Sequence, residues 1–288
     1  MSSGRPSRSE RVSAQYGSAQ AAAEYARAGR QPGHQGRFLR LRLHLVQDLL
    51  ASFPGGDLLD AGCGPGGMAR ALLESRPRDF RISVLDQSPA MVEYCVASAR
   101  DAGEVRPAVG RLEAMPFADS SFDVTLVMGA LEYADARAAV REISRVTRPG
   151  GLVIVTMLNP LSPYRVTEWF LYWPLLRVLE AFERSLGAPA DRRHGARSTG
   201  IHAFPAGRLR GLMRQAGLQP VDLVHFDVTL LVPPLDRLPP MMRRAERAAC
   251  ERTVTRGWRR WTGTGYIVAA TRQPRASRST GGRRLPPS

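Results

Sequence analysis

The sequence predicts an α/β fold in which a mostly parallel β-sheet carries helices on both faces. Between residues 57 and 156, short apolar runs of strand length alternate with amphipathic runs of helix length. The first apolar run leads directly into a cluster of glycines, as strands do where they turn into a helix at a ligand site. The chain has 288 residues, of which 43% are hydrophobic, so it can bury the core of one enlarged domain. Alternating strands and helices indicate parallel strands joined by right-handed crossovers.

Two helices are expected ahead of the sheet. Residues 18–28 have high helix propensity, and residues 37–52 carry apolar side chains three to four positions apart. The Arg-Leu alternation over 40–45 also fits a short strand, but the length of the pattern favours a helix. Tyr16 precedes the first helix and Tyr25 lies within it, where they form either a lid over a ligand or ordinary helix packing.

The alternating block is expected to supply five strands and three helices. The strands are 57–61, 81–86, 105–110, 122–128 and 152–157, and the helices are 68–74, 89–102 and 135–147. The Arg-Pro-Gly-Gly run at 148–151 is expected to form the turn before the fifth strand.

After residue 159 the regular alternation of strands and helices ends. A helix at 205–216 and strands at 218–229 and 265–272 are expected to complete the sheet. Two insertions interrupt this part, one at 160–203 and one at 230–264 that is expected to be helical around 240–256. Residues 1–12 and 273–288 are rich in Ser, Arg, Gly and Pro, and we expect them to be disordered tails outside a domain spanning 13–272.

The formal net charge of +15 raises the question of a nucleic-acid partner. All 41 basic residues are arginines, and residues 55–151 hold 11 arginines against 14 acidic residues. The positive excess therefore lies outside the most regular part of the chain. An arginine-only composition rich in Ala, Gly and Pro indicates a GC-rich coding bias, which raises the net charge without selection for phosphate binding. We therefore expect no nucleic-acid partner.

The remaining composition favours a soluble protein. No charge-free stretch is long enough for a membrane span, and the first residues lack the apolar segment of a secretory signal. Cys63, Cys95 and Cys250 have no metal-binding spacing and fit a reducing compartment. We expect a cytoplasmic monomer or homodimer without a bound metal.

The most informative segment is the strand end and glycine loop at 58–67, LLDAGCGPGG. Its glycines satisfy the G-x-G-x-x-G spacing and Asp86 ends the next strand, so a dinucleotide-binding dehydrogenase is one interpretation. Asp60 argues against it, because a carboxylate directly before the loop repels a pyrophosphate and attracts a sulfonium or ammonium group. Cys63 in this loop is either a thiol of lowered pKa at a helix N-terminus or, as we prefer, a small filler.

Several further motifs follow the loop in a fixed order. They are VLDQS at 84–88, EAMPF at 113–117 leading into SFD at 121–123, and RPGG at 148–151 before the fifth strand. This series resembles the motifs of class I S-adenosylmethionine (SAM)-dependent methyltransferases over about residues 55–157, and most resembles the ubiquinone- and menaquinone-biosynthesis-like subgroup of bacteria. The resemblance implies SAM as cofactor and a Rossmann-like seven-stranded sheet with its last strand antiparallel. It also implies an N-terminal helical lid over 13–54 and an inserted helical cap.

The resemblance also implies roles for the loop residues. Asp60 would lie near the methionine amino group, and Gly62 and Gly64 would pass beneath the methionine and ribose with no side chain in the way. Asp86 would accept two hydrogen bonds from the ribose hydroxyls, a geometry that suits a carboxylate. Met128 would offer its carbonyl to the amino group. Without a ligand, the glycines would form only a tight turn and the acids would act as caps.

The adenine end departs from the family pattern. Gln87 and Met91 would border the adenine, but many relatives carry an acid, two residues before Glu113, that accepts a hydrogen bond from the adenine amino group. This sequence has Arg111 there, and arginine accepts none. Adenine recognition would then rest on the backbone of Leu112 or on Glu113, with Arg111 at the surface.

The resemblance places the start of the substrate side at Leu131, Glu132 and Tyr133. Methyl transfer from a sulfonium needs mainly in-line positioning in a desolvated site, so a catalytic residue is optional. For an oxygen or nitrogen nucleophile, the candidate general bases are His202, Glu132, His34, Tyr25 and Tyr16. For His202, a backbone-bonded position at a helix entry is the favoured alternative.

The aromatic run at 169–182 is the best indication of the acceptor. It follows the fifth strand, so Trp169 and Trp173 are expected to roof a pocket at the carboxyl edge of the sheet, with at least half of the run packed on the core. This favours a small, apolar or aromatic-containing methyl acceptor. Aromatic residues beside arginines also fit peripheral contact with an anionic lipid surface. The alternatives are a quinone precursor, lipid or macromolecule as acceptor, or a SAM-binding module without activity.

Overall fold

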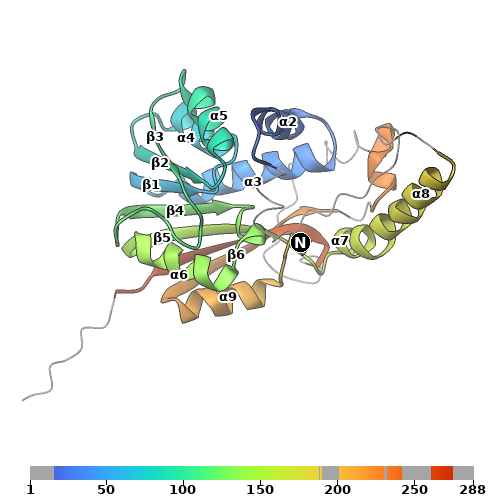
Figure 1. Cartoon of the computed structure of the whole chain (residues 1–288). Helices are drawn as coiled ribbons and strands as arrows, with labels where there is room; N and C mark the ends of the chain where they lie inside the picture. The colour runs from blue at the N-terminus through green and yellow to red at the C-terminus, as the bar shows by residue number, and fades with distance from the viewer. Residues whose placement is uncertain (1–15, 188, 190–200, 230–231, 242–260, 275–288) are drawn as a thin grey trace, which may run out of the picture.

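The computed structural model describes residues 16–187, 189, 201–229, 232–241 and 261–274. Its centre is a seven-stranded sheet in the order β3-β2-β1-β4-β5-β7-β6 (Figure 1). Strands β1 to β5 run parallel to one another, and β7 runs antiparallel to both β5 and β6. The bounds are β1 Gly56–Ala61, β2 Phe80–Asp86, β3 Val105–Val109, β4 Phe122–Met128, β5 Thr147–Leu158, β6 Leu218–Val228 and β7 Gly263–Arg272. The predicted sheet, with its last strand antiparallel, is confirmed.

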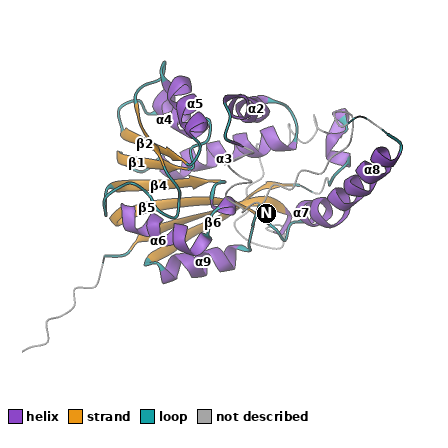
Figure 2. Ribbon diagram, in the orientation of Figure 1, coloured by secondary structure: helices purple, strands orange, loops and turns teal. Residues whose placement is uncertain are grey.

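Helices cover both faces of this sheet (Figure 2). One face packs against α3 His34–Leu50, α4 Gly67–Ser75 and α5 Pro89–Ala99. The other packs against α6 Ala136–Val146 and α9 Ala206–Gln215. The first described helix, α2 Ala19–Arg30, lies over α3 and α5.

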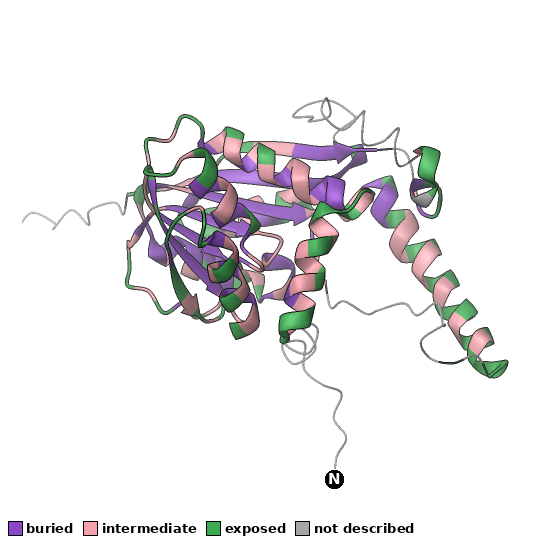
Figure 3. Ribbon diagram, turned by 90° about the horizontal axis from the view of Figure 1, so that it is seen from above, coloured by how far each residue is buried: buried purple, intermediate pink, exposed green. Residues whose placement is uncertain are grey.

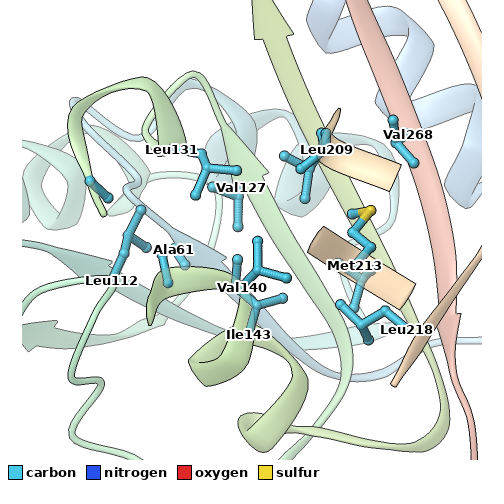
Figure 4. Packing of buried hydrophobic residues seen from close by; sticks show 14 of the residues in the cluster. Ala61, Leu112, Val127, Leu131, Val140, Ile143, Leu209, Met213, Leu218 and Val268 are labelled. Atoms are coloured by element: carbon cyan, nitrogen blue, oxygen red, sulfur yellow. The ribbon is translucent and has the colours of Figure 1, made fainter. Parts of the chain in front are cut away.

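The two cores explain why the central strands read as unbroken apolar runs. Successive residues of a strand point to opposite faces, and Leu58 packs toward the α3 side whereas Leu59 packs toward the α6 side. Figure 4 shows the second core, where Val140 and Ile143 of α6 meet Val127 of β4. Complete burial of one such side chain contributes about 1.5–3 kcal/mol to stability, so strands that are buried on both faces need apolar residues at nearly every position.

Most element boundaries agree with the sequence predictions within a few residues, and two differ informatively. Residues 40–45 lie inside helix α3, so the alternative of a strand there is excluded. Strand β5 begins at Thr147, whereas we predicted a turn at 148–151 and a strand from 152. The pairing register of β4 and β5 shifts between Phe122 and Val124, so the Arg-Pro-Gly-Gly run is an irregular entry to the strand.

The first insertion differs most from its prediction. After β5 come α7 Pro163–Thr167, the π-helical turn η2 Glu168–Tyr172 and α8 Trp173–Ser185. Figures 1 and 3 show α8 projecting from the body of the molecule, and no residue of η2 or α8 is buried. The prediction that at least half of 169–182 packs on the core is therefore wrong. Apolar content marks a segment that can be buried, but it does not say by what.

Other predictions fall partly or wholly outside the described residues. These are the two tails, the helix around 240–256 and Cys250. Among the helices that the structure describes, none is long and apolar enough to cross a bilayer.

Candidate functional site

The glycine loop after β1 is tied to the end of β2. The backbone N–H groups of Gly62 and Cys63 both donate to the Leu85 carbonyl, at 2.6 and 3.0 Å. Gly62 has a φ of +79°, and a Cβ at this position would lie 2.2 Å from the Cβ of Ala130. Gly64 has a φ of +51°, with open space where its Cβ would be. The loop therefore presents bare backbone to the space above it.

Asp86, at the end of β2, faces this loop. Its Oδ2 accepts the Gly64 N–H at 3.0 Å, and its Oδ1 accepts the Ser88 N–H at 2.9 Å. Burial raises the pKa of this carboxyl, and the backbone donors oppose that shift. Because a carboxylate has about four acceptor positions, each oxygen keeps capacity for one more donor. The group can therefore bind two neighbouring hydroxyls.

A cavity opens between the loop, the end of β2 and helix α2. Its empty volume is about 730 Å³, including open solvent at its mouth. Predicted site residues make up much of its wall. The lining residues are Tyr16, Tyr25, Gly62, Gly64, Pro65, Leu85, Asp86, Gln87, Met91, Gly110, Leu112, Glu113, Gly129, Ala130, Tyr133 and Ala134.

A second cavity adjoins the first and shares four lining residues with it, including Tyr25 and Gly64. Asp60 and Met128 line this second cavity only. Asp60 is 1% exposed, and its Oδ2 has no hydrogen-bond partner among the described residues. Burial raises the pKa of Asp60 to about 7, opposed by the positive charge of Arg42 and reinforced by Asp86. An unsatisfied buried carboxylate oxygen is costly, and a cationic donor would relieve that cost.

Arg42 is a site residue that the sequence reasoning missed. It lies on α3, is 9% exposed, lines the second cavity, and its Nε has no hydrogen-bond partner among the described residues. A Cβ at Gly129 would be 2.3 Å from its Nη1, and Gly129 has a φ of +72°, a conformation that favours glycine. The available signal was its place in the stripe Phe38, Arg42, Val46 and Leu50, where a charged residue interrupts an apolar helix face.

Three tyrosines close the first cavity on the side of α2. The hydroxyls of Tyr16 and Tyr133 are 3.0 Å apart, and the Tyr16 and Tyr25 rings meet edge to face at 6.0 Å between centroids. The Ser88 hydroxyl donates to the Tyr16 carbonyl at 2.8 Å, which ties this segment to the N-terminus of α5. The position fits the predicted lid.

At the opposite end of the cavity, Arg111 does not face the lining. Its side chain is 51% exposed and its Nη2 lies 3.3 Å from Glu113 Oε1. The same Glu113 oxygen accepts the Asp135 N–H at 2.9 Å. Burial alone would raise the pKa of Glu113, but these donors lower it overall. The carboxylate is thus held in place, and the surface interpretation of Arg111 fits the structure.

The candidate bases lie in different environments. Glu132 is 3% exposed and its Oε1 accepts the Leu158 N–H at 3.0 Å. Burial raises its pKa, and the Leu158 N–H and Arg42 oppose that shift. His202 is exposed, and its backbone N–H donates to the Glu132 carbonyl at 2.8 Å. Neither residue lines the two cavities.

His34 belongs to a buried ion-pair cluster instead. Its Nδ1 is 3.2 Å from Asp227 Oδ2, its ring stacks on Tyr164 at 4.0 Å, and Arg37 Nε donates to Asp227 Oδ1 at 2.7 Å. Burial lowers the pKa of His34, so the ring is neutral near pH 7. Its surroundings are those of a structural residue that fixes the start of α3 against β6.

Two further predictions have clear outcomes. Trp169 and Trp173 lie in η2 and at the start of α8, outside the lining of both cavities, so the structure does not bring them to the cofactor loop. Cys63 is buried beside Cys95, and that contact together with burial raises its pKa well above the usual value. Cys63 is therefore the small filler we preferred. Among the described residues, no group of His, Cys, Asp or Glu could hold a metal.

Comparison with known proteins agrees with this geometry. Residues 59–155 match the family model described as a methyltransferase domain. Nocamycin O-methyltransferase of Saccharothrix syringae is 31% identical over 70% of this chain and 72% of its own length. A malonyl-[acyl-carrier protein] O-methyltransferase of Dechloromonas aromatica is 32% identical over 58% of this chain, which spans about half (53%) of that relative. A SAM-dependent methyltransferase structure from Thermotoga maritima superposes with a TM-score of 0.53 at 21% identity, covering 88% of this chain and 97% of that one.

Proposed function

Since the chain belongs to the family of SAM-dependent methyltransferases, we propose that it transfers a methyl group from SAM to a small, apolar or aromatic-containing acceptor. The observation that carries the proposal is the pair of carboxylates on either side of the glycine loop. Asp60 keeps an unsatisfied buried oxygen, and Asp86 keeps acceptor capacity for two hydroxyls. A positively charged amino acid joined to a ribose presents matching groups to these two acids.

The two adjoining cavities suggest how the parts of SAM are distributed. Asp60 would bind the ammonium group, and the buried guanidinium of Arg42 would bind the carboxylate on the other side of the same amino acid. Asp86 would bind the ribose hydroxyls. Gln87, Met91, Leu112 and Glu113 would surround the adenine.

When bound, SAM supplies a methyl group that its sulfonium already activates. The residues of this chain then have to orient the two reactants and exclude water. The tyrosines of the lid and the bare backbone at Gly62 and Gly64 fit that task, because the rings help to enclose the cavity and the glycines place no side chain in it.

The class of acceptor is inferred from the walls around the donor site and from the relatives. Leu85, Ala130, Ala134 and the tyrosine rings give the first cavity a mainly apolar lining. Two of the relatives are named as O-methyltransferases, one of nocamycin and one of malonyl-[acyl-carrier protein]. An oxygen nucleophile on a small organic molecule is consistent with both observations. Glu132 would be the base for such an acceptor: it lines neither cavity, but its Oε2 would lie 3.8 Å from a Cβ on Gly129, which lines the first cavity.

Two measurements test the proposal in sequence. Calorimetric titration should give micromolar binding of S-adenosylhomocysteine and no binding of NAD. Methyl-labelled SAM incubated with the protein and a small-molecule extract should then transfer label to one compound, identified by mass spectrometry. Asp86→Ala is the control, and it should lose at least tenfold in cofactor affinity, the scale of about 1.5 kcal/mol for a charge-assisted hydrogen bond. Tight binding without transfer to any extract would assign a binding module instead.

A further inference from the structure

The arm formed by η2 and α8 carries a continuous apolar surface toward solvent. Its large apolar side chains are among the most exposed of the described residues, with Phe170 at 76%, Leu186 at 70% and Val178 at 67% exposed. Leu171, Leu175 and Phe182 are each exposed by 60% or more. Burial of each such side chain is favourable, so a surface of this kind indicates an interaction site.

The spacing of these residues makes one stripe. Positions 171, 175, 178, 182 and 186 follow one another at intervals of three or four, which places them on the same side of a helix. The charged residues of α8 occupy other positions around the axis, with Arg177 and Arg184 balanced by Glu180 and Glu183. Arg184 is exposed and pairs with Glu180 at 2.7 Å. The arm is therefore a projecting amphipathic helix whose solvent side is the apolar one.

The charge of the protein selects between the surfaces that could cover this stripe. The chain carries a formal net charge of +15, so a second copy of it is repelled and an anionic surface is attracted. Residues 188–200, which follow α8, add three arginines and one aspartate to the sequence next to the stripe. An apolar helix face with a basic surrounding sequence is the combination that binds anionic lipid.

The place of the arm in the fold connects it to the donor site. Strand β5 ends at Leu158 and α7 follows at Pro163, so the arm leaves from the carboxyl ends of the parallel strands. Asp60 and Asp86 lie at the carboxyl ends of β1 and β2, on the same edge of the sheet. The arm and the donor site therefore start from the same edge of the sheet.

We propose that the η2–α8 arm docks on an anionic lipid bilayer, with its apolar stripe inserted between the headgroups. The protein would then work at a membrane surface, which suits an apolar acceptor that partitions into lipid. The docking itself requires no catalysis, so its test is independent of the test of methyl transfer.

Cosedimentation with vesicles tests this docking on the full-length protein. Vesicles of phosphatidylcholine alone are compared with vesicles that contain phosphatidylglycerol, at low and at physiological salt. We expect binding to the anionic vesicles, weakened by salt. The double variant Leu175→Glu/Phe182→Glu should lower binding at least tenfold while the melting temperature and the affinity for S-adenosylhomocysteine stay unchanged.

A matched control places the same charges elsewhere. Val109 and Val221 are also exposed valines, at 53% and 59%, on strands β3 and β6. Val109→Glu/Val221→Glu adds the same two charges and should bind vesicles like the unmodified protein. Equal losses in both double variants, or no binding of the unmodified protein to anionic vesicles at low salt, would overturn the proposal. A dimer in sedimentation velocity that Leu175→Glu/Phe182→Glu dissociates, without vesicle binding, would assign the stripe to a second copy and overturn it as well.

Discussion

The phenolic oxygens of Tyr16 and Tyr133 lie 3.0 Å apart, although the two residues are 117 positions apart in the sequence. Tyr133 follows strand β4 in a short 3-10 helix, and Tyr16 precedes helix α2. The hydrogen bond between them therefore joins the predicted N-terminal lid to the carboxyl edge of the sheet across the first cavity.

Removal of this bond should loosen the lid. We expect Tyr16→Phe and Tyr133→Phe each to weaken binding of S-adenosylhomocysteine two- to tenfold, the range of about 0.5–1.5 kcal/mol for one hydrogen bond. The double variant should lose no more than either single variant, since both remove the same bond. Tyr25→Phe keeps the edge-to-face contact with Tyr16 and is the matched control. Calorimetric titration gives the affinities, and additive losses would show that the hydroxyls act separately.

Ionisation of Asp60 should lower the stability of the folded protein and favour cofactor binding. Its folded-state pKa of about 7 lies above the ordinary value of 3.8, so the folded protein holds a proton that the unfolded chain has released. The stability from this proton is complete below about pH 4 and is lost as the pH rises through about 7. At pH 8, urea unfolding should therefore give Asp60→Asn a higher free energy of unfolding than the unmodified protein, by at most about 4 kcal/mol. This difference in stability should shrink toward pH 5.

The same carboxyl should make cofactor binding depend on pH with the opposite sign. Only the ionised form attracts an ammonium group, so affinity for S-adenosylhomocysteine should rise about tenfold between pH 6 and pH 8 for a pKa near 7. Asp60→Asn should bind weakly at both values. A variant that keeps the pH dependence would show that another group produces it.

Replacement by alanine should affect mainly stability at Gly62 and mainly cofactor affinity at Gly64. Gly62→Ala places a methyl group 2.2 Å from the Ala130 Cβ at a positive φ, and the overlap should cost more than about 2 kcal/mol in urea unfolding. Adding Ala130→Gly should restore the part of the lost unfolding free energy that is due to this overlap. Gly64→Ala meets no atom within 4 Å, so it should lower stability by only about 1 kcal/mol. Because its methyl group enters the cavity, its main effect should be on cofactor affinity.

These variants also mark the limits of what the sequence could predict. Asp60, Gly62 and Asp86 were found because the residues around them alternate between strand and helix, and the carboxyl ends of neighbouring parallel strands meet at one edge. Ala130 and Gly129 carry no such local signal. They matter because tertiary packing brings them against Gly62 and Arg42.

The aromatic run of α8 shows the converse limit. Its composition indicates burial, but a stripe that faces the core and a stripe that faces solvent have the same period. The helix that follows the π-helical turn at Glu168–Tyr172 projects from the body, and nothing in the residue types at 169–182 distinguishes that outcome from packing on the sheet.

Arg42 should act mainly on the carboxylate of the cofactor. Arg42→Gln is expected to weaken S-adenosylhomocysteine about tenfold or more, the scale of a charged hydrogen bond. It should weaken the decarboxylated analogue less, and only because loss of the positive charge raises the pKa of Asp60 further. Arg40→Gln is the matched control, because Arg40 lines the same cavity from the same helix but donates to the backbone carbonyls of Gly29 and Gln31. Equal losses for both ligands would mean that Arg42 supports the fold near Asp60 and does not contact the carboxylate.

The proposed role of Glu132 as a general base can be tested separately from its structural role. Glu132→Gln keeps an oxygen for the Leu158 N–H, so the fold and cofactor affinity should be unchanged. If Glu132 takes the proton of the acceptor, turnover should fall by about 100-fold or more. In the unmodified protein, turnover should rise with pH through a raised carboxyl pKa, because only the ionised form accepts a proton. His202→Ala is the control, since that side chain is exposed and the variant keeps the backbone N–H that donates to the Glu132 carbonyl. Full turnover in Glu132→Gln would reduce Glu132 to a buried anchor for β5 and leave methyl transfer to positioning alone.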